Sequence, residues 1–359
     1  MRVHVTDLKN GDRLNADAFN DFGLHVLSKG TTLQGKEISM LFQHQIDYVE
    51  IDLRADAEMA KPSEPTNTNR TLESGMSPKW MPTVQPIYED TIKGCRTLFE
   101  TAFKEGTINE AAVQATFQPL VDNFRMERDV VSMLLLLNTK DDYTYQHSVQ
   151  VGMLSFYLAS WMGYSEEEAV EIGQAGFLHD IGKCRIKEDI LNKPGRLTDE
   201  EFAEIKRHPD YGFEIIQQSM ENEVAALVAA QHHERMNGTG YPLGLIGDQI
   251  HPVAKIVAVV DVYSAMISMR VYRERRDLLH VLRELYRMSF SELDAETTQT
   301  FIKHMIPNFI GKQALLSDGQ KGVIVMTHPT EFFRPLIQIQ DRFIDLTIER
   351  KLDVEEIFL

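Results

Sequence analysis

The chain has 359 residues, of which 43% are apolar and 25% charged, a globular composition with room for two or three domains. Its formal net charge of −17 disfavours broad binding to nucleic acid polymers or to anionic lipid. No apolar run approaches the roughly 18 residues that span a bilayer, no signal peptide is apparent, and the two cysteines suit a reducing compartment, so we expect a cytoplasmic protein without a membrane span.

Residues 1–57 are predicted to form a small α+β domain. Short β-type segments such as "VHVTDL" and "DYVEID" flank a Gly-centred turn and a helical stretch near "GKEISMLFQHQ". Residues 58–85 are rich in Pro, Ser, Thr and Asn and have no sustained periodicity, which predicts a linker. The sequence therefore predicts a domain boundary near residue 60.

Residues 86–310 are predicted to be entirely helical. Apolar residues recur at spacings of three and four in segments such as "IYEDTIKGCRTLFETAFKEG" and "TDEEFAEIKRHPDYGFEIIQQ". Several such segments joined by short loops predict a helical bundle. Residues 311–359 return to strand-like pieces, "KGVIVMTH", "RPLIQIQD" and "FIDLTIE", which predict a short C-terminal β appendage. The fold class is therefore mainly α.

Five of the twelve histidines lie at or near the ends of predicted helical segments. They are His147, His179, His208, His232 and His233. A single histidine at a helix end can simply cap carbonyls or interact with the helix dipole. On a helix, adjacent side chains diverge by about 100°, yet near a helix end the rings of His232 and His233 can still converge on one ion or on two neighbouring ions.

Two carboxylates accompany these histidines in apolar surroundings. Asp180 follows His179 directly after the run "AVEIGQAGFL", where a carboxylate is costly unless it is paired or bound to a metal. Asp261 interrupts the apolar run "KIVAVVDVYSAM"; the alternative for it is an exposed position on an amphipathic helix. Five imidazoles and two carboxylates match the donors of a two-metal hydrolytic centre.

The order of these residues resembles the HD-GYP subgroup of the HD-domain metal-dependent phosphohydrolases, enzymes that hydrolyse cyclic di-GMP. The resemblance covers roughly residues 130–290 and rests on "HDIGK", "LNKPGRLTDEEF", "HP", "HHERMNGTGYP" and "VVDVYSAM". It implies an HD-domain helical bundle with two divalent metal ions. Iron or manganese suits the donors best, and cobalt, nickel and zinc are compatible.

The resemblance also assigns ligands to each ion. It places His147, His179, Asp180 and Asp261 around one metal ion, and Asp180 bridges to a second ion held by His208, His232 and His233. A hydroxide would bridge the two ions. Such an arrangement lowers the pKa of the shared water toward about 7 and neutralises charge on a phosphodiester. Lys183, three residues after Asp180, would reach a phosphate oxygen, so Asp180 and Lys183 are the predicted catalytic residues.

The family's "GYP" corresponds to Gly240, Tyr241 and Pro242. A turn that shapes the pocket mouth and a direct contact with substrate both remain open for these residues. Glu234 is a candidate hydrogen-bonding partner of the ligands. Downstream, "SMRVYRERR" resembles an Arg–x–Tyr–Arg segment in which cations and an aromatic ring suit phosphate and guanine; helix-end salt bridges are the alternative. The matching residues are Arg270, Tyr272 and Arg273.

Three departures from the family pattern affect these expectations. Some members have a glutamate four residues before the first histidine that helps to hold a third metal ion, and this chain has Tyr143 there, which favours a binuclear site. Asn237 replaces an aspartate in the loop. Met269 and Val271 replace the usual Asp and Pro beside the arginines.

The sequence therefore predicts a phosphodiesterase that converts cyclic di-GMP to linear pGpG, with GMP as a further product left open. Two alternatives remain: a catalytically weak cyclic di-GMP sensor or interaction module, and an HD hydrolase for another cyclic dinucleotide. A cyclic dinucleotide is the expected partner. A protein partner at the N-terminal domain or GYP loop is left open, as is a homodimer through helices 86–137.

Overall fold

The computed structural model describes residues 2–4, 8, 11–19, 25–34, 41, 46, 48–52, 81–124, 143–193, 195–271 and 278–358. The chain divides into two compact units, residues 78–308 and residues 1–77 with 309–359. The described helices of two turns or more lie in the first unit and the strands in the second, which confirms the mainly α fold with a C-terminal β appendage. Within the described ranges, no helix is both long and apolar enough to cross a bilayer.

The helical unit begins within the predicted linker, because its first helix starts at Met81. Its helices are α2 (Met81–Glu105), α3 (Glu110–Phe124), α5 (Tyr143–Trp161), α6 (Glu166–Leu178), α7 (Glu188–Leu191), α8 (Asp199–Ile205), α9 (His208–Ser219), α10 (Glu223–Gln231), α11 (Pro252–Val271), α12 (Leu278–Met288) and α13 (Ala295–Met305). Short 3-10 helices are η2 (Ile181–Arg185), η3 (Gly247–Gln249) and η4 (Ile306–Phe309).

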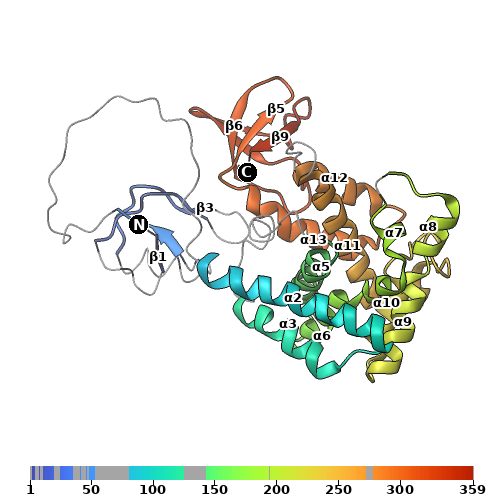
Figure 1. Cartoon of the computed structure of the whole chain (residues 1–359). Helices are drawn as coiled ribbons and strands as arrows, with labels where there is room; N and C mark the ends of the chain where they lie inside the picture. The colour runs from blue at the N-terminus through green and yellow to red at the C-terminus, as the bar shows by residue number, and fades with distance from the viewer. Residues whose placement is uncertain are drawn as a thin grey trace, which may run out of the picture. The chain divides into compact units, whose positions relative to one another are not determined.

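Helix α5 runs through the middle of this unit and packs against α2, α6, α11 and α13 (Figure 1). Every residue from 146 to 159 is buried, because the helix has apolar or small residues on all sides rather than along one stripe. Such a helix is stable only inside a bundle. It therefore forms the scaffold on which the first predicted ligand, His147, is mounted.

Helices α5 and α6 form a close antiparallel pair. A Cβ atom on Gly152 of α5 would lie 3.0 Å from the carbonyl oxygen of Gly173 on α6, so glycine at this position allows the two backbones to approach closely. The connecting loop is only four residues long, 162–165. Because the helices are antiparallel, the start of α5 and the end of α6 lie at the same end of the pair, which brings His147 close to His179.

In its described residues, the second unit contains two small sheets and one larger sheet. Strands β1 (Arg2–His4) and β4 (Tyr48–Glu50) pair antiparallel, as do β2 (Ala18–Phe19) and β3 (His25–Leu27). The C-terminal sheet is antiparallel with the order β8-β7-β6-β5-β9. Its strands are β5 (Gln313–Leu316), β6 (Lys321–Met326), β7 (Leu336–Ile339), β8 (Arg342–Asp345) and β9 (Val354–Phe358). The three predicted strands correspond to β6, β7 and β8, whereas most of the helical stretch predicted near residues 35–45 lies outside the described residues.

Candidate metal centre

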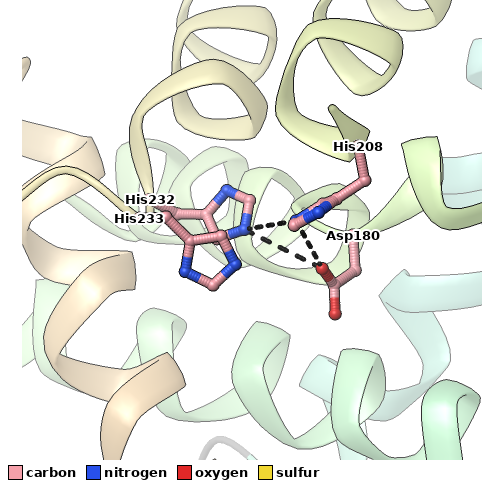
Figure 2. Close-up of side chains that lie close together, drawn as sticks. All are labelled: Asp180, His208, His232 and His233. Carbon is pink, nitrogen blue, oxygen red and sulfur yellow. Dashed lines mark hydrogen bonds and ion pairs between the residues drawn. The ribbon is translucent and has the colours of Figure 1, made fainter. Parts of the chain in front are cut away.

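The five predicted histidines come from four helices of the bundle and converge on one place. His147 lies in the second turn of α5, His179 is the C-cap of α6, His208 is the first residue of α9, and His232 is the C-cap of α10 with His233 directly after it. Four of the five are almost completely buried, and His233 is partly buried. Figure 2 shows His208, His232 and His233 gathered around Asp180.

A break between two helices just before His208 directs the His208 side chain into the site. The sequence predicted one helical segment from 198 to 218, but α8 ends at Ile205 and α9 begins at His208. Pro209, the second residue of α9, has no N–H and suits the first turn of a new helix. The new helix therefore starts at His208, whose side chain is completely buried.

A pair of glycines lets the segment after Asp180 lie against the start of α9. A Cβ atom on Gly182 would overlap the carbonyl oxygen of His208 and the backbone nitrogen of Gly212. Only a residue without a side chain allows this approach. The "G" of "HDIGK" therefore positions Asp180 beside His208.

Asp180 divides its two carboxylate oxygens between two groups of histidines. Its Oδ2 lies 3.2 Å from Nε2 of His179 and 3.9 Å from Nε2 of His147. Its Oδ1 lies 3.3 Å from Nε2 of His208 and 3.8 Å from Nε2 of His232 (Figure 2). Among the described residues, two sets have ligand atoms within 4.8 Å of one another, and both contain Asp180. They are His147, His179, Asp180 and Asp180, His208, His232, His233.

Asp261 lies between the same two groups. Its Oδ1 is 3.0 Å from Nε2 of His147 and 3.8 Å from Nε2 of His179, and its Oδ2 is 3.7 Å from Nδ1 of His233. Asp261 is 6% exposed, so the alternative of an exposed position on an amphipathic helix does not hold. The structure thus brings all seven predicted ligands together.

The donor set fits divalent metal ions. Nε2 of His179 and Oδ1 of Asp180 are buried and have no hydrogen-bonding partner among the described residues, which is costly unless an ion or water binds them. Nδ1 of His179, His208 and His232 each donates to a main-chain carbonyl at 2.7–2.9 Å, which leaves Nε2 facing the centre. Imidazole nitrogens and carboxylate oxygens together suit iron, manganese and related ions.

The electrostatic surroundings keep Asp180, His232 and His233 in the protonation states that bind a cation. Burial alone would raise the pKa of Asp180, but His179 and Lys183 lower it well below its usual range. Burial, reinforced by His233 and His179, lowers the pKa of His232 well below its usual range. Burial also lowers the pKa of His233 to about 3. Neutral imidazoles and ionised carboxylates are the forms that coordinate metals.

Lys183 lies at the rim of this centre. It belongs to the 3-10 helix η2, in which residues three apart lie above one another. Its Nζ is 2.6 Å from Oδ2 of Asp180, and its side chain is 25% exposed. Burial would lower the pKa of Lys183, but Asp180 raises it above its usual value, so the ammonium is charged at neutral pH.

The loop with Gly240, Tyr241 and Pro242 folds back onto the histidine segment. A Cβ atom on Gly240 would lie 2.5 Å from the carbonyl oxygen of His233, which excludes larger residues there. The ring of Tyr241 packs against the ring of His233 at a tilt of 30°, with a centroid distance of 4.6 Å. Tyr241 therefore borders the centre.

Glu234 anchors this loop, whereas its expected role as a partner of the ligands stays a prediction. It is 2% exposed, and its carboxylate oxygens accept hydrogen bonds from the backbone N–H groups of Leu243 and Leu245 at 2.7 and 2.9 Å. A carboxylate with two acceptor oxygens suits two N–H donors that lie two residues apart in one loop. The loop after Pro242 is thus held by the residue that follows the paired histidines.

The remaining predicted residues are placed less completely. Arg270 lies in α11, whereas Tyr272 and Arg273 fall outside the described residues. Tyr143 is 44% exposed, and its ring stacks on His147 with a centroid distance of 5.9 Å and an interplanar angle of 14°. An aromatic ring thus lies where some family members have a glutamate ligand.

Two buried polar residues that connect to the ligand His147 were not singled out from the sequence. Gln150 follows His147 by one helical turn, and Ser264 follows Asp261 by the same spacing. Residues three apart share a helix face. That spacing is the signal that could have identified them.

Comparisons with known proteins agree with this geometry. Residues 131–297 match the HD domain family. A cyclic di-GMP phosphodiesterase of Pseudomonas aeruginosa is 34% identical over 244 residues, which cover 66% of this chain and 58% of that protein. One of Thermotoga maritima is 40% identical over 178 residues, which cover 49% and 48%. A 3'3'-cGAMP-specific phosphodiesterase of Vibrio cholerae is 33% identical over 177 residues, which cover 48% and 41%.

The chain therefore contains an HD domain, at residues 131–297. More particularly, it is a homologue of bacterial cyclic dinucleotide phosphodiesterases, which confirms the resemblance predicted from the motifs. It spans about half the length of these curated relatives, between 41% and 58%.

Proposed function

We propose that this chain is a metal-dependent phosphodiesterase that hydrolyses cyclic di-GMP to linear pGpG, with further hydrolysis to GMP left to the product assay below. The observation that carries the proposal is the position of Asp180, whose Oδ1 and Oδ2 face different histidine groups. A carboxylate in this position is suited to bridge two ions. Homology to cyclic di-GMP phosphodiesterases supports the choice of substrate.

Each ion would have its own set of ligands. His147, His179, Asp180 and Asp261 would hold one ion, and Asp180, His208, His232 and His233 would hold the other. When bound, two such ions supply an activated water and neutralise charge on the phosphodiester. Iron and manganese suit this donor set best.

The side chains around the ions would bind and orient the substrate. The ammonium of Lys183 contacts Asp180 and is partly exposed, so it can transfer one of its hydrogen bonds to a nonbridging phosphate oxygen. The ring of Tyr241 covers His233 and limits access of water from that side. We propose that Gly240, Pro242, Arg270, Tyr272 and Arg273 complete the substrate site.

A second substrate, 3'3'-cGAMP, is favoured by one observation. A phosphodiesterase named for this mixed dinucleotide is 33% identical, close to the 34% of the cyclic di-GMP enzyme from Pseudomonas aeruginosa. Both compounds have two phosphodiester bonds and at least one guanine, so the same metal centre suits both. A sensor without turnover is disfavoured, since all seven predicted ligands and Lys183 are present and close together.

A product assay tests the proposal. Chain loaded in turn with manganese, iron, nickel or cobalt is incubated with each of the two cyclic dinucleotides, and the products are separated by chromatography. We expect linear pGpG to appear from cyclic di-GMP with at least one metal. Binding of the dinucleotide without product in every metallated sample would favour the sensor instead.

A further inference from the structure

His147 differs from the other buried histidines of the centre in the hydrogen-bonding partner of its Nδ1 atom. Nδ1 of His179, His208 and His232 each donates to the carbonyl three residues earlier, at a helix end where carbonyls lack intrahelical partners. His147 lies near the start of α5, and its Nδ1 faces a side chain on another helix. That partner is the hydroxyl of Ser264 on α11, at 3.1 Å.

The proton of the Ser264 hydroxyl already takes part in another hydrogen bond. Ser264 donates to Oε1 of Gln150 at 3.1 Å, and His147, Gln150 and Ser264 are all buried. A serine hydroxyl has one proton to donate, and an amide oxygen can only accept. Toward His147, the Ser264 oxygen can therefore only accept, which requires the proton of the imidazole to be on Nδ1.

We propose that Gln150 and Ser264 are positioning residues that hold His147 as the Nδ1-protonated tautomer, so that its Nε2, 3.0 Å from Oδ1 of Asp261, can offer its lone pair to a metal ion shared with that carboxylate. The inference rests on the proposed two-metal site, because it concerns one ligand of the first ion. Without the acceptor on Gln150, Ser264 is free to donate to Nδ1. The proton of the imidazole would then be on Nε2, where it blocks coordination.

Two substitutions of matched size isolate the hydroxyl. Ser264→Thr and Ser264→Val add similar bulk to the buried position, but only threonine retains the donor. Metal-free chain is titrated with manganese in a calorimeter. We expect the valine variant to bind one of two ions about 10- to 100-fold more weakly than the threonine variant, with the other ion unaffected. Gln150→Met, which removes the acceptor without opening a large cavity, should show the same selective loss relative to the unmodified chain.

Thermal unfolding of each metal-free variant separates a loss of ligation from a loss of fold, and Gln150→Met keeps the test decisive if the substitutions at 264 do not fold. Suppose that the unmodified chain binds two ions and hydrolyses substrate. Equal manganese affinities of the threonine and valine variants would then overturn the positioning role alone. An unmodified chain that binds no manganese would overturn both this role and the proposed function.

Discussion

Asp180 is the residue on which both histidine groups depend, because each of its oxygens faces one of them. We expect Asp180→Asn to lose both ions, since an amide is a much weaker bridging ligand than a carboxylate. The loss of affinity should exceed the roughly 10- to 100-fold that changes outside the ligand set usually cost. Elemental analysis of the purified variant measures the metal content.

His147→Gln is the matched control for this prediction, because His147 belongs to only one of the two groups. We expect this variant to retain one ion per chain, with circular dichroism showing that both variants are folded. Loss of one ion only in the Asp180 variant would mean that the carboxylate does not bridge.

The seven ligand candidates could be predicted because their motifs resemble those of a known family, and because Asp180 and Asp261 stand out in apolar flanks. The role of Glu234 could not. Its position directly after His233 suggested a partner for the ligands, whereas its carboxylate binds the N–H groups of Leu243 and Leu245. That contact depends on how the intervening loop turns back, which local sequence does not determine.

Among the secondary-structure elements, η2 and α9 make the contact that places Asp180 beside His208. We expect Gly182→Ala to separate η2 from α9, because the added Cβ would overlap backbone atoms of His208 and Gly212 that cannot move independently. Overpacking of this kind typically costs about 1–3 kcal/mol. The free energy of unfolding in urea and the metal content of the variant should both fall.

Gly212→Ala provides a graded comparison at the same contact. Its Cβ would lie 3.2 Å from the Cβ of Ala229, a much milder approach, and alanine favours the helix by up to about 1 kcal/mol. We expect this variant to be close to the unmodified chain in stability. Equal destabilisation by both substitutions would contradict the account of why Gly182 is a glycine.

The loop anchored by Glu234 gives a second prediction for an element. In Glu234→Gln, the side-chain NH₂ would face an N–H of the loop instead of accepting from it, at a cost of about 1–3 kcal/mol. We expect faster hydrogen exchange at the amides of Leu243 and Leu245. Glu214→Gln, at a 53% exposed side chain on α9, is the control and should leave these amides unchanged.

Helices with clear apolar periodicity could be predicted, but two features of the elements were missed. The break between α8 and α9 falls inside a stretch whose periodicity is helical throughout, and Pro209 is the signal that could have identified it. Helix α13 was not singled out, although Asp294 caps it by accepting from the N–H of Thr297 at 2.9 Å.

For the whole molecule, the buried centre predicts how the stability of the metal-free chain varies with pH. The lowered pKa values of His232 and His233 mean that, below about pH 6.5, the unfolded chain binds protons that the folded chain excludes. Stability should therefore decline as pH falls from about 6 to about 4, by on the order of 1–3 kcal/mol per pH unit. The lowered pKa of Asp180 adds a further decline below its unfolded value, near 3.8.

His179 acts in the opposite direction. Burial would lower its pKa, but Asp180 raises it above 6.5, so its contribution is fully present below pH 6.5 and is lost as pH rises through the higher value. Thermal unfolding in the presence of a chelator, measured from pH 4 to pH 8, should show a maximum near pH 6 to 7. A flat profile between pH 6 and pH 4 would mean that the imidazoles are not buried in the neutral form.

The mainly α fold with a β appendage was predictable, because periodicity changes at the boundaries of the chain's parts. The domain limits of 1–57, 86–310 and 311–359 stay predictions, as do a protein partner and a homodimer. Their outcome depends on surfaces that pair across long distances in the sequence or between chains. Nothing in the local pattern of residues encodes such pairing.

Metal content and turnover measured on one purified sample test the central claim most directly. The chain is loaded with manganese or iron, its metal content is determined by elemental analysis, and the same sample is incubated with cyclic di-GMP while products are followed by chromatography. We expect two ions per chain and the appearance of linear pGpG, both lost in Asp180→Asn. Two bound ions without any product, or product formation that is independent of metal, would contradict it.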